Sequence, residues 1–139
     1  MNIAENLLNN HFCLFPNTGE HAEKNQIFCK GEKCKSDFAF FDTKNKFAYN
    51  AKKIEVGDKP YFLILNVFDS QEKVSLNGTL YQNKRDSSPE FTGYLGDKKN
   101  PVAKLQANRK QTREGKWYLY VDVLPADSER LISLSECPF

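Results

Sequence analysis

The sequence has little of what a membrane-spanning or strongly charged protein needs. Its longest apolar run, Tyr61 to Leu65, is far shorter than the roughly 20 residues that cross a bilayer, so no transmembrane segment is predicted. Lys and Arg number 20 against 18 Asp and Glu, and this balance excludes strong long-range steering of a polyanion by the whole molecule. Any site for nucleic acid must therefore be a local patch.

Residues that commonly carry catalysis are also scarce. His11 and His21 are the only histidines, and neither lies in a nucleophile-elbow context with a Ser or Cys partner. The acidic residues are dispersed without a recognisable carboxylate pair, and Gly93 with Gly96 is too thin a pattern for a dinucleotide fingerprint. The sequence therefore predicts a protein that is not an enzyme and uses no small-molecule cofactor.

The first ten residues lack the pattern of a secretory signal. Met1 to Asn10 contains the acidic Glu5 and several asparagines instead of a cationic segment followed by an apolar one. The expected compartment is therefore the cytoplasm, where thiols stay reduced and structural disulfides are rare.

Four cysteines are present, and three interpretations of them stay open. They can be small apolar fillers, since free cysteine is among the most buried residue types, and Cys13 between Phe12 and Leu14 suits this role. They can form one or two disulfides, for which the four cysteines, Cys13, Cys29, Cys34 and Cys137, allow three pairings. The third interpretation is a zinc site with three thiolates and an imidazole, whose candidate ligands are His11, Cys13, Cys29 and Cys34.

The length of 139 residues and a composition of 40% hydrophobic residues fit one domain with one core. Within it we expect a Cys-containing N-terminal part with a hairpin (1–56), a main antiparallel sheet (57–124) and a C-terminal tail (125–139). Ile3, Leu7 and Leu8 recur at helical spacing and predict a short N-terminal helix.

Most of the chain has the pattern of β-strands. Two aromatic runs, Phe38 to Phe41 and Phe47 to Tyr49, flank turn residues and predict a hairpin. The run Tyr61 to Phe68 predicts a buried central strand. The alternation from Val74 to Gln82 predicts a strand with an inward row of Val74, Leu76, Gly78 and Leu80. A polar loop (83–90) then leads to a short strand, Phe91 to Leu95.

Two further strands follow with clear alternation. One begins at Pro101 and turns Ala103, Leu105 and Ala107 inward. The other turns inward Trp117, Leu119, Val121 and Val123. If these strands are neighbours, their other side gathers one outward set of tyrosines, lysines and amides: Tyr81, Lys104, Gln106, Asn108, Lys116, Tyr118 and Tyr120.

This outward set is the candidate binding surface. Outward tyrosines in neighbouring strands give platforms for stacking, and base stacking on an aromatic ring is worth roughly 1–3 kcal/mol. The stretch from Lys98 to Lys116 holds seven basic residues against Glu114 alone, a local net charge of +6. The predicted binding residues are Tyr81, Lys84, Arg85, Lys104, Arg109, Lys110, Arg113, Lys116, Tyr118 and Tyr120. The alternatives are a merely solvated, lysine-protected face and a face covered by other segments.

The segment from Leu76 to Val123 resembles small β-rich proteins borne by phages and plasmids. The similarity lies in a Gly-x-Leu-x-x-Asn-Lys run (78–84), in Pro-Glu-Phe-Thr-Gly (89–93) and in Arg-Glu-Gly-Lys-Trp-Tyr-Leu (113–119). The resemblance implies a mobile-element origin, where short proteins without catalytic motifs usually bind nucleic acid or a host machine. The compartment is then the cytosol of the host cell.

We therefore expect an α+β domain, mainly antiparallel β, with its sheet curled toward a small barrel similar to oligonucleotide-binding (OB) barrels. The first functional hypothesis is a non-enzymatic accessory protein that binds single-stranded nucleic acid. The second is a phage-encoded inhibitor of a host defence protein, of the anti-CRISPR type, whose tyrosines and arginines anchor a protein interface. A virion component is a third class, for which the sequence shows no repeat or heptad.

Overall fold

The computed structural model describes residues 3–20, 22–29, 31–58, 61–83 and 89–126. His21, Lys84, Arg85, Cys137 and most of the predicted tail lie outside these residues. A short helix, α1 (Ile3–Leu7), comes first and is followed by the strand β1 (His11–Pro16). The single-turn helix η1 (Ala22–Lys24) then precedes a small hairpin of β2 (Gln26–Cys29) and β3 (Glu32–Lys35).

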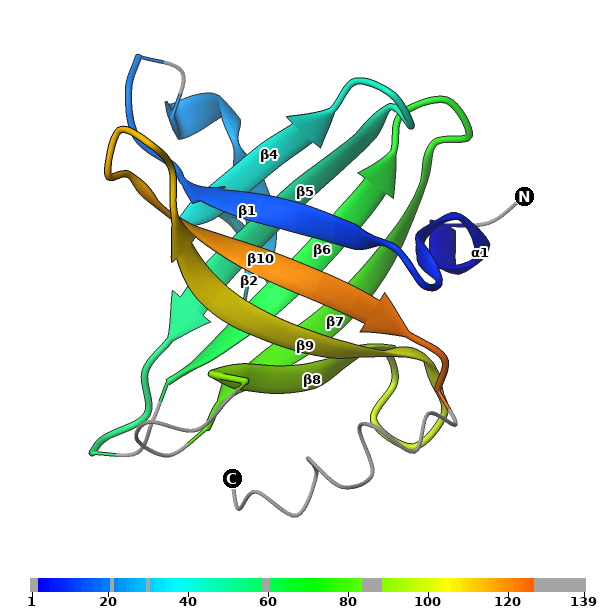
Figure 1. The fold of residues 1–139 in the computed structure, drawn as a ribbon. Helices are drawn as coiled ribbons and strands as arrows, with labels where there is room; N and C mark the ends of the chain where they lie inside the picture. The colour runs from blue at the N-terminus through cyan, green and yellow to red at the C-terminus, as the bar shows by residue number, and fades with distance from the viewer. Residues whose placement is uncertain (1–2, 21, 30, 59–60, 84–88, 127–139) are drawn as a thin grey trace.

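Seven further strands follow without another described helix between them. They are β4 (Phe38–Asp42), β5 (Phe47–Ile54), β6 (Phe62–Asp69), β7 (Val74–Gln82), β8 (Phe91–Gly96), β9 (Pro101–Gln111) and β10 (Trp117–Leu124). Together with β1 they form a closed antiparallel barrel in the order β1-β10-β9-β8-β7-β6-β5-β4, and Figure 1 shows the strands winding around it. Each strand therefore pairs with its sequence neighbour in the barrel, and β1 closes the ring against β10.

Strand alternation decides which side chains fill the barrel. In β6 the exposure alternates between half-buried and buried from Phe62 to Asp69, so every second residue enters the core. The largest buried side chains are Tyr49, Phe47 and Phe91. Ile3 and Leu7 of α1 belong to the same core, so the helix covers one end of the barrel (Figure 1). Among the described residues, no helix has the length and apolarity that crossing a membrane demands.

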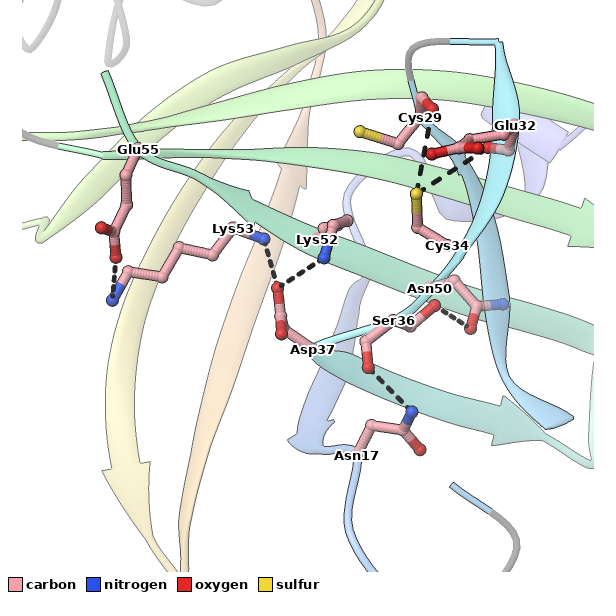
Figure 2. Close-up of polar contacts among 10 residues, drawn as sticks. All are labelled: Asn17, Cys29, Glu32, Cys34, Ser36, Asp37, Asn50, Lys52, Lys53 and Glu55. Carbon is pink, nitrogen blue, oxygen red and sulfur yellow. Dashed lines mark hydrogen bonds and ion pairs between the residues drawn. The ribbon is translucent and has the colours of Figure 1, made fainter. Parts of the chain in front are cut away.

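The β2–β3 hairpin lies outside the barrel and is fastened to β5 at its base. The Ser36 hydroxyl donates a hydrogen bond of 2.8 Å to Oδ1 of Asn50. The backbone N–H of Lys53 donates one of 2.7 Å to the Asp37 carboxylate, as Figure 2 shows. The Asn17 side-chain amide donates to the Ser36 carbonyl oxygen at 2.8 Å. These contacts hold the hairpin against the outer surface of the sheet.

The expected mainly antiparallel β class with one short N-terminal helix is confirmed. The OB-like form of the barrel is not, because an OB barrel has five strands in Greek-key order whereas this one has eight in an up-and-down order. The sheet also extends beyond residues 57–124, since β1, β4 and β5 from the N-terminal part are barrel strands.

Three side chains depart from the inward and outward assignment. Val74 was predicted to face inward but is 49% exposed, because it is the first residue of β7. Trp117 was predicted to face inward but is 51% exposed, because it begins β10 at the end of the barrel, beyond the core. Gln106 lies on the outward row opposite Thr92 and Asp122, yet it is buried.

Candidate functional site: an aromatic and cationic face on β1, β9 and β10

Three neighbouring strands bring Lys110, Tyr118 and Tyr120 together on the outer surface. In the register of β9 and β10, Tyr118 lies opposite Lys110 and Tyr120 lies opposite Asn108. On the other side of β10, Cys13 of β1 lies opposite Tyr120. Side chains directly opposite each other in antiparallel strands are about 4.5–5.5 Å apart at Cβ, so these groups form one surface. We call this surface the β1–β9–β10 face.

The rings on this face form two stacked pairs. The centroids of His11 and Tyr120 are 4.5 Å apart with 18° between the ring planes. Those of Phe15 and Tyr118 are 5.0 Å apart with 22° between the planes. Both pairs join β1 to β10, so stacking places aromatic surface from the two strands side by side.

A lysine lies over one of these rings. The ammonium nitrogen of Lys110 is 3.9 Å from the centroid of the Tyr120 ring, well within cation–π distance. Lys110 is exposed and makes no ion pair within the described residues. A cation and a flat ring are therefore available together on the same patch of surface.

Further cations and an exposed indole lie at the ends of β9 and β10 and in the turn between them, with Arg109 and Trp117 on the side of the sheet opposite to Lys110. Arg109 lies 5.7 Å from the Trp117 ring centroid and pairs with Glu90, with 2.7 Å between Nε and Oε2. Lys116 and Glu114 form an ion pair of 3.8 Å in which both side chains are exposed, so it is worth little. Arg113 is exposed in the same turn.

Tyr81 and Lys104 are not part of this face. Tyr81 also points outward, but it is on β7, three strands from β10, and in an eight-stranded barrel this places it roughly 135° around the circumference. Its hydroxyl lies 3.4 Å from that of Tyr94 on β8. Lys104 is six residues before Lys110 on β9, about 20 Å away along the strand, and lies opposite Tyr94.

Tyr81 and Tyr120 are neutral near pH 7, because the pKa of each is raised. Burial, followed by the hydrogen bond to Tyr94, raises the pKa of Tyr81 to about 12. Desolvation, with Asp122 as the next cause, raises the pKa of Tyr120 above its ordinary value. The charge of the β1–β9–β10 face therefore comes from its lysines and arginines.

The sequence-based prediction missed the contribution of β1. His11 and Phe15 had not been assigned to the binding surface, although the alternation of His11, Cys13 and Phe15 with the buried Phe12 and Leu14 is a regular strand pattern. Six residues of such alternation were the signal that would have identified the strand.

The structure does not bring the proposed zinc ligands together. His11 and Cys13 are on β1, whereas Cys29 and Cys34 are in the β2–β3 hairpin. Among the described residues, no group of three or more His, Cys, Asp or Glu side chains is placed to hold a metal ion. The thiols of Cys13, Cys29 and Cys34 are free, and Cys29 is buried, as expected of an apolar filler. The Cys34 thiol faces the Cys29 carbonyl oxygen at 3.8 Å (Figure 2).

The reactivity of the Cys13 thiol, at the centre of the face, tests the environment described for this residue. Desolvation raises the pKa of this thiol, and the nearby Lys110 opposes the shift. Since the thiolate is the nucleophile, the rate of alkylation by iodoacetamide should still be rising at about pH 9, where an unperturbed cysteine approaches its plateau. The measurement uses a variant with Cys29→Ala, Cys34→Ser and Cys137→Ser. A plateau reached below about pH 8.5 would contradict the described environment.

Comparisons of the chain with models of protein families, with curated proteins and with solved structures found no match.

Proposed function

We propose that this protein is a non-enzymatic accessory protein of a phage or other mobile element that binds single-stranded nucleic acid in the cytosol of the host cell. The observation that carries the proposal is the position of Lys110 over the Tyr120 ring, beside the two stacked ring pairs of the β1–β9–β10 face. Proteins that bind single strands combine this kind of aromatic surface with nearby cations.

The geometry suits the insertion of a base. Tyr118 and Tyr120 are two residues apart on β10, so their attachment points are about 7 Å apart along the strand. Successive stacked bases are separated by about 3.4 Å, so a base between two rings needs about twice that distance. A base that stacks on Tyr120 displaces the Lys110 ammonium from the ring, and the ammonium then pairs with a neighbouring phosphate. The pair of Tyr120 and Lys110 thus contacts both the base and the phosphate backbone of the nucleic acid.

Arg113 and Lys116, in the β9–β10 turn, add cations beside this face. Both lie within six residues of Lys110, and the intervening acidic residue is Glu114. Arg109 is on the opposite side of the sheet from Lys110 and is paired with Glu90, so it is not counted here. Counterion release from contacts to phosphate makes binding depend on salt, with a slope of about −0.7 per phosphate for single strands. One phosphate for each of Lys110, Arg113 and Lys116 predicts a slope of about −2.

The test is a titration of a labelled 20-nucleotide DNA, followed by fluorescence anisotropy. Between 50 and 200 mM salt the affinity should fall about 20-fold for three phosphate contacts. Lys110→Ala should weaken binding and make the slope shallower by about 0.7. Lys44→Ala, in the exposed β4–β5 turn, is the matched control and should change neither. Absence of binding at 50 mM salt would refute the proposal.

A second candidate function is inhibition of a host defence protein, such as a CRISPR effector, through a protein interface. It is favoured by the 51% exposure of Trp117 beside Arg109, because Trp, Tyr and Arg dominate interface hot spots. A pull-down from host lysate that survives nuclease treatment and is lost in Trp117→Ala would favour this candidate. Loss of the pulled-down material on nuclease treatment would favour nucleic-acid binding.

A further inference from the structure

A second site candidate lies on the outer surface of β4 to β7, next to the β1–β9–β10 face, where the ring centroids of Phe15 and Phe40 are 5.6 Å apart. Two hollows of about 460 Å³ and about 320 Å³ meet at Ala48 and Asn50 of β5. The larger one reaches from the β2–β3 hairpin to β6 and β7, and the smaller one reaches to β4 and the turn after β1. Both volumes fall in the range of pockets that hold small ligands.

The floor of the larger hollow is a row of three asparagines. Asn50, Asn66 and Asn77 are direct register partners on β5, β6 and β7. Neighbouring members of the row are therefore about 5 Å apart, which is a spacing that one flat ligand can bridge. Ser75, on the next row, adds a hydroxyl to the lining.

Much of the hydrogen-bonding capacity of this row is not used by the protein. The Asn66 amide donates to Oδ1 of Asn77 at 2.9 Å, and Oδ1 of Asn50 accepts from the Ser36 hydroxyl at 2.8 Å (Figure 2). Within the described part of the chain, this leaves the Nδ2 groups of Asn50 and Asn77 as donors and Oδ1 of Asn66 as an acceptor. Donors and an acceptor therefore alternate along the floor.

Aromatic side chains flank this polar floor. Phe28 and Phe68 line the larger hollow, and Phe28 is 64% exposed. Phe40 and Phe41 line the smaller one and are 38% and 46% exposed. Large exposed rings beside unpartnered amides are suited to a ligand that has both an apolar face and polar edges.

Charge narrows the class of ligand further. Among the described residues that line either hollow, Lys33 has the one charged side chain. No carboxylate is present in this lining to hold a cation. A phosphate ligand would need more than one exposed ammonium, and an apolar ligand would leave the amides unpaired. Hydroxyl groups that both donate and accept, carried on a ring with an apolar C–H face, match the lining. These are the properties of a sugar.

We propose that the two hollows form a binding site for a neutral oligosaccharide. One sugar ring lies over Asn66 and Asn77, and the next lies across Asn50 toward Phe41. The site uses none of the residues of the β1–β9–β10 face, so it goes beyond the nucleic-acid function and does not depend on it.

The test is titration of ¹⁵N-labelled protein with cellobiose, maltose, chitobiose or glucose, followed by NMR. The side-chain amide signals of Asn50, Asn66 and Asn77 should shift with at least one disaccharide, while those of Asn10 and Asn45 stay in place. That disaccharide should bind at least fivefold more tightly than its monosaccharide, because it spans both hollows.

A pair of variants on β7 separates binding from folding. Asn77→Ala should weaken the disaccharide at least tenfold, whereas Thr79→Ala, which is outward on the same strand but outside the hollows, should not change its affinity. Absence of shifts with every probe at 50 mM would overturn the proposal, as would equal affinity of the two variants. Titration of the same samples with DNA reports on the other face independently.

Discussion

Replacing Gly93 with alanine should destabilise the barrel by about 3 kcal/mol or more, a large part of the 5–15 kcal/mol that stabilises a typical domain. Gly93 of β8 pairs with Leu80 of β7. A Cβ atom at this position would lie 1.8 Å from the Thr79 carbonyl oxygen and 2.9 Å from Cα of Leu80. Both are backbone atoms of a paired strand, so no change of rotamer relieves the clash. Urea unfolding measures the loss.

Gly115→Ala is the matched control for this substitution. Gly115 lies in the β9–β10 turn at φ +84°, and a Cβ atom there would meet nothing within 4 Å. Its substitution costs only the backbone strain of a left-handed residue, about 1–2 kcal/mol. A Gly93→Ala protein no less stable than Gly115→Ala would show that β7 and β8 are not packed as closely as described.

The strands of the second half could be predicted because their alternation is nearly unbroken. In β9 the residues Ala103, Leu105 and Ala107 are all fully buried, as their spacing required. The predicted hairpin also forms, with Phe41 opposite Ala48. In these segments the local pattern and the final burial agree, so the sequence alone was informative.

Closure of the barrel was not predictable in the same way. β1 pairs with β10, where His11 is opposite Asp122, so the two strands come from opposite ends of the described chain. Alternation shows which face of a strand is buried but does not say which strand lies beside it. The hairpin of β2 and β3 was missed for a different reason, since Glu32 to Lys35 is a polar segment with little apolar alternation.

The same lack of information about strand order explains why the predicted binding surface grouped residues that lie together in the structure with one that does not. Tyr118, Tyr120 and Lys110 lie together because they are on strands joined by a short turn, so their proximity follows from local register. Tyr81 was grouped with them on the assumption that its strand neighbours theirs. Because β8 and β9 lie between its strand and β10 in a closed barrel, it faces a different direction.

The double variant Tyr118→Ala, Tyr120→Ala should weaken binding of single-stranded DNA about 30-fold or more. Two stacking rings at roughly 1–3 kcal/mol each supply at least about 2 kcal/mol, and each 1.4 kcal/mol is a factor of ten in affinity. Anisotropy titration at 50 mM salt measures the change. Loss of the contacts with Phe15 and His11 also costs stability, so the folded fraction is checked by circular dichroism.

Two controls test whether the loss of DNA affinity depends on the aromatic rings and on their position in the barrel. Tyr118→Phe, Tyr120→Phe keeps both rings and should bind within about threefold of the unaltered protein, since stacking needs no hydroxyl. Tyr81→Ala removes a ring that also faces outward but lies three strands around the barrel, so it should leave the affinity unchanged. If Tyr81→Ala weakened binding as much as the double variant did, the DNA would contact a surface much wider than β1, β9 and β10. Binding would then follow the outward tyrosines in general rather than the two stacked pairs that β1 makes with β10.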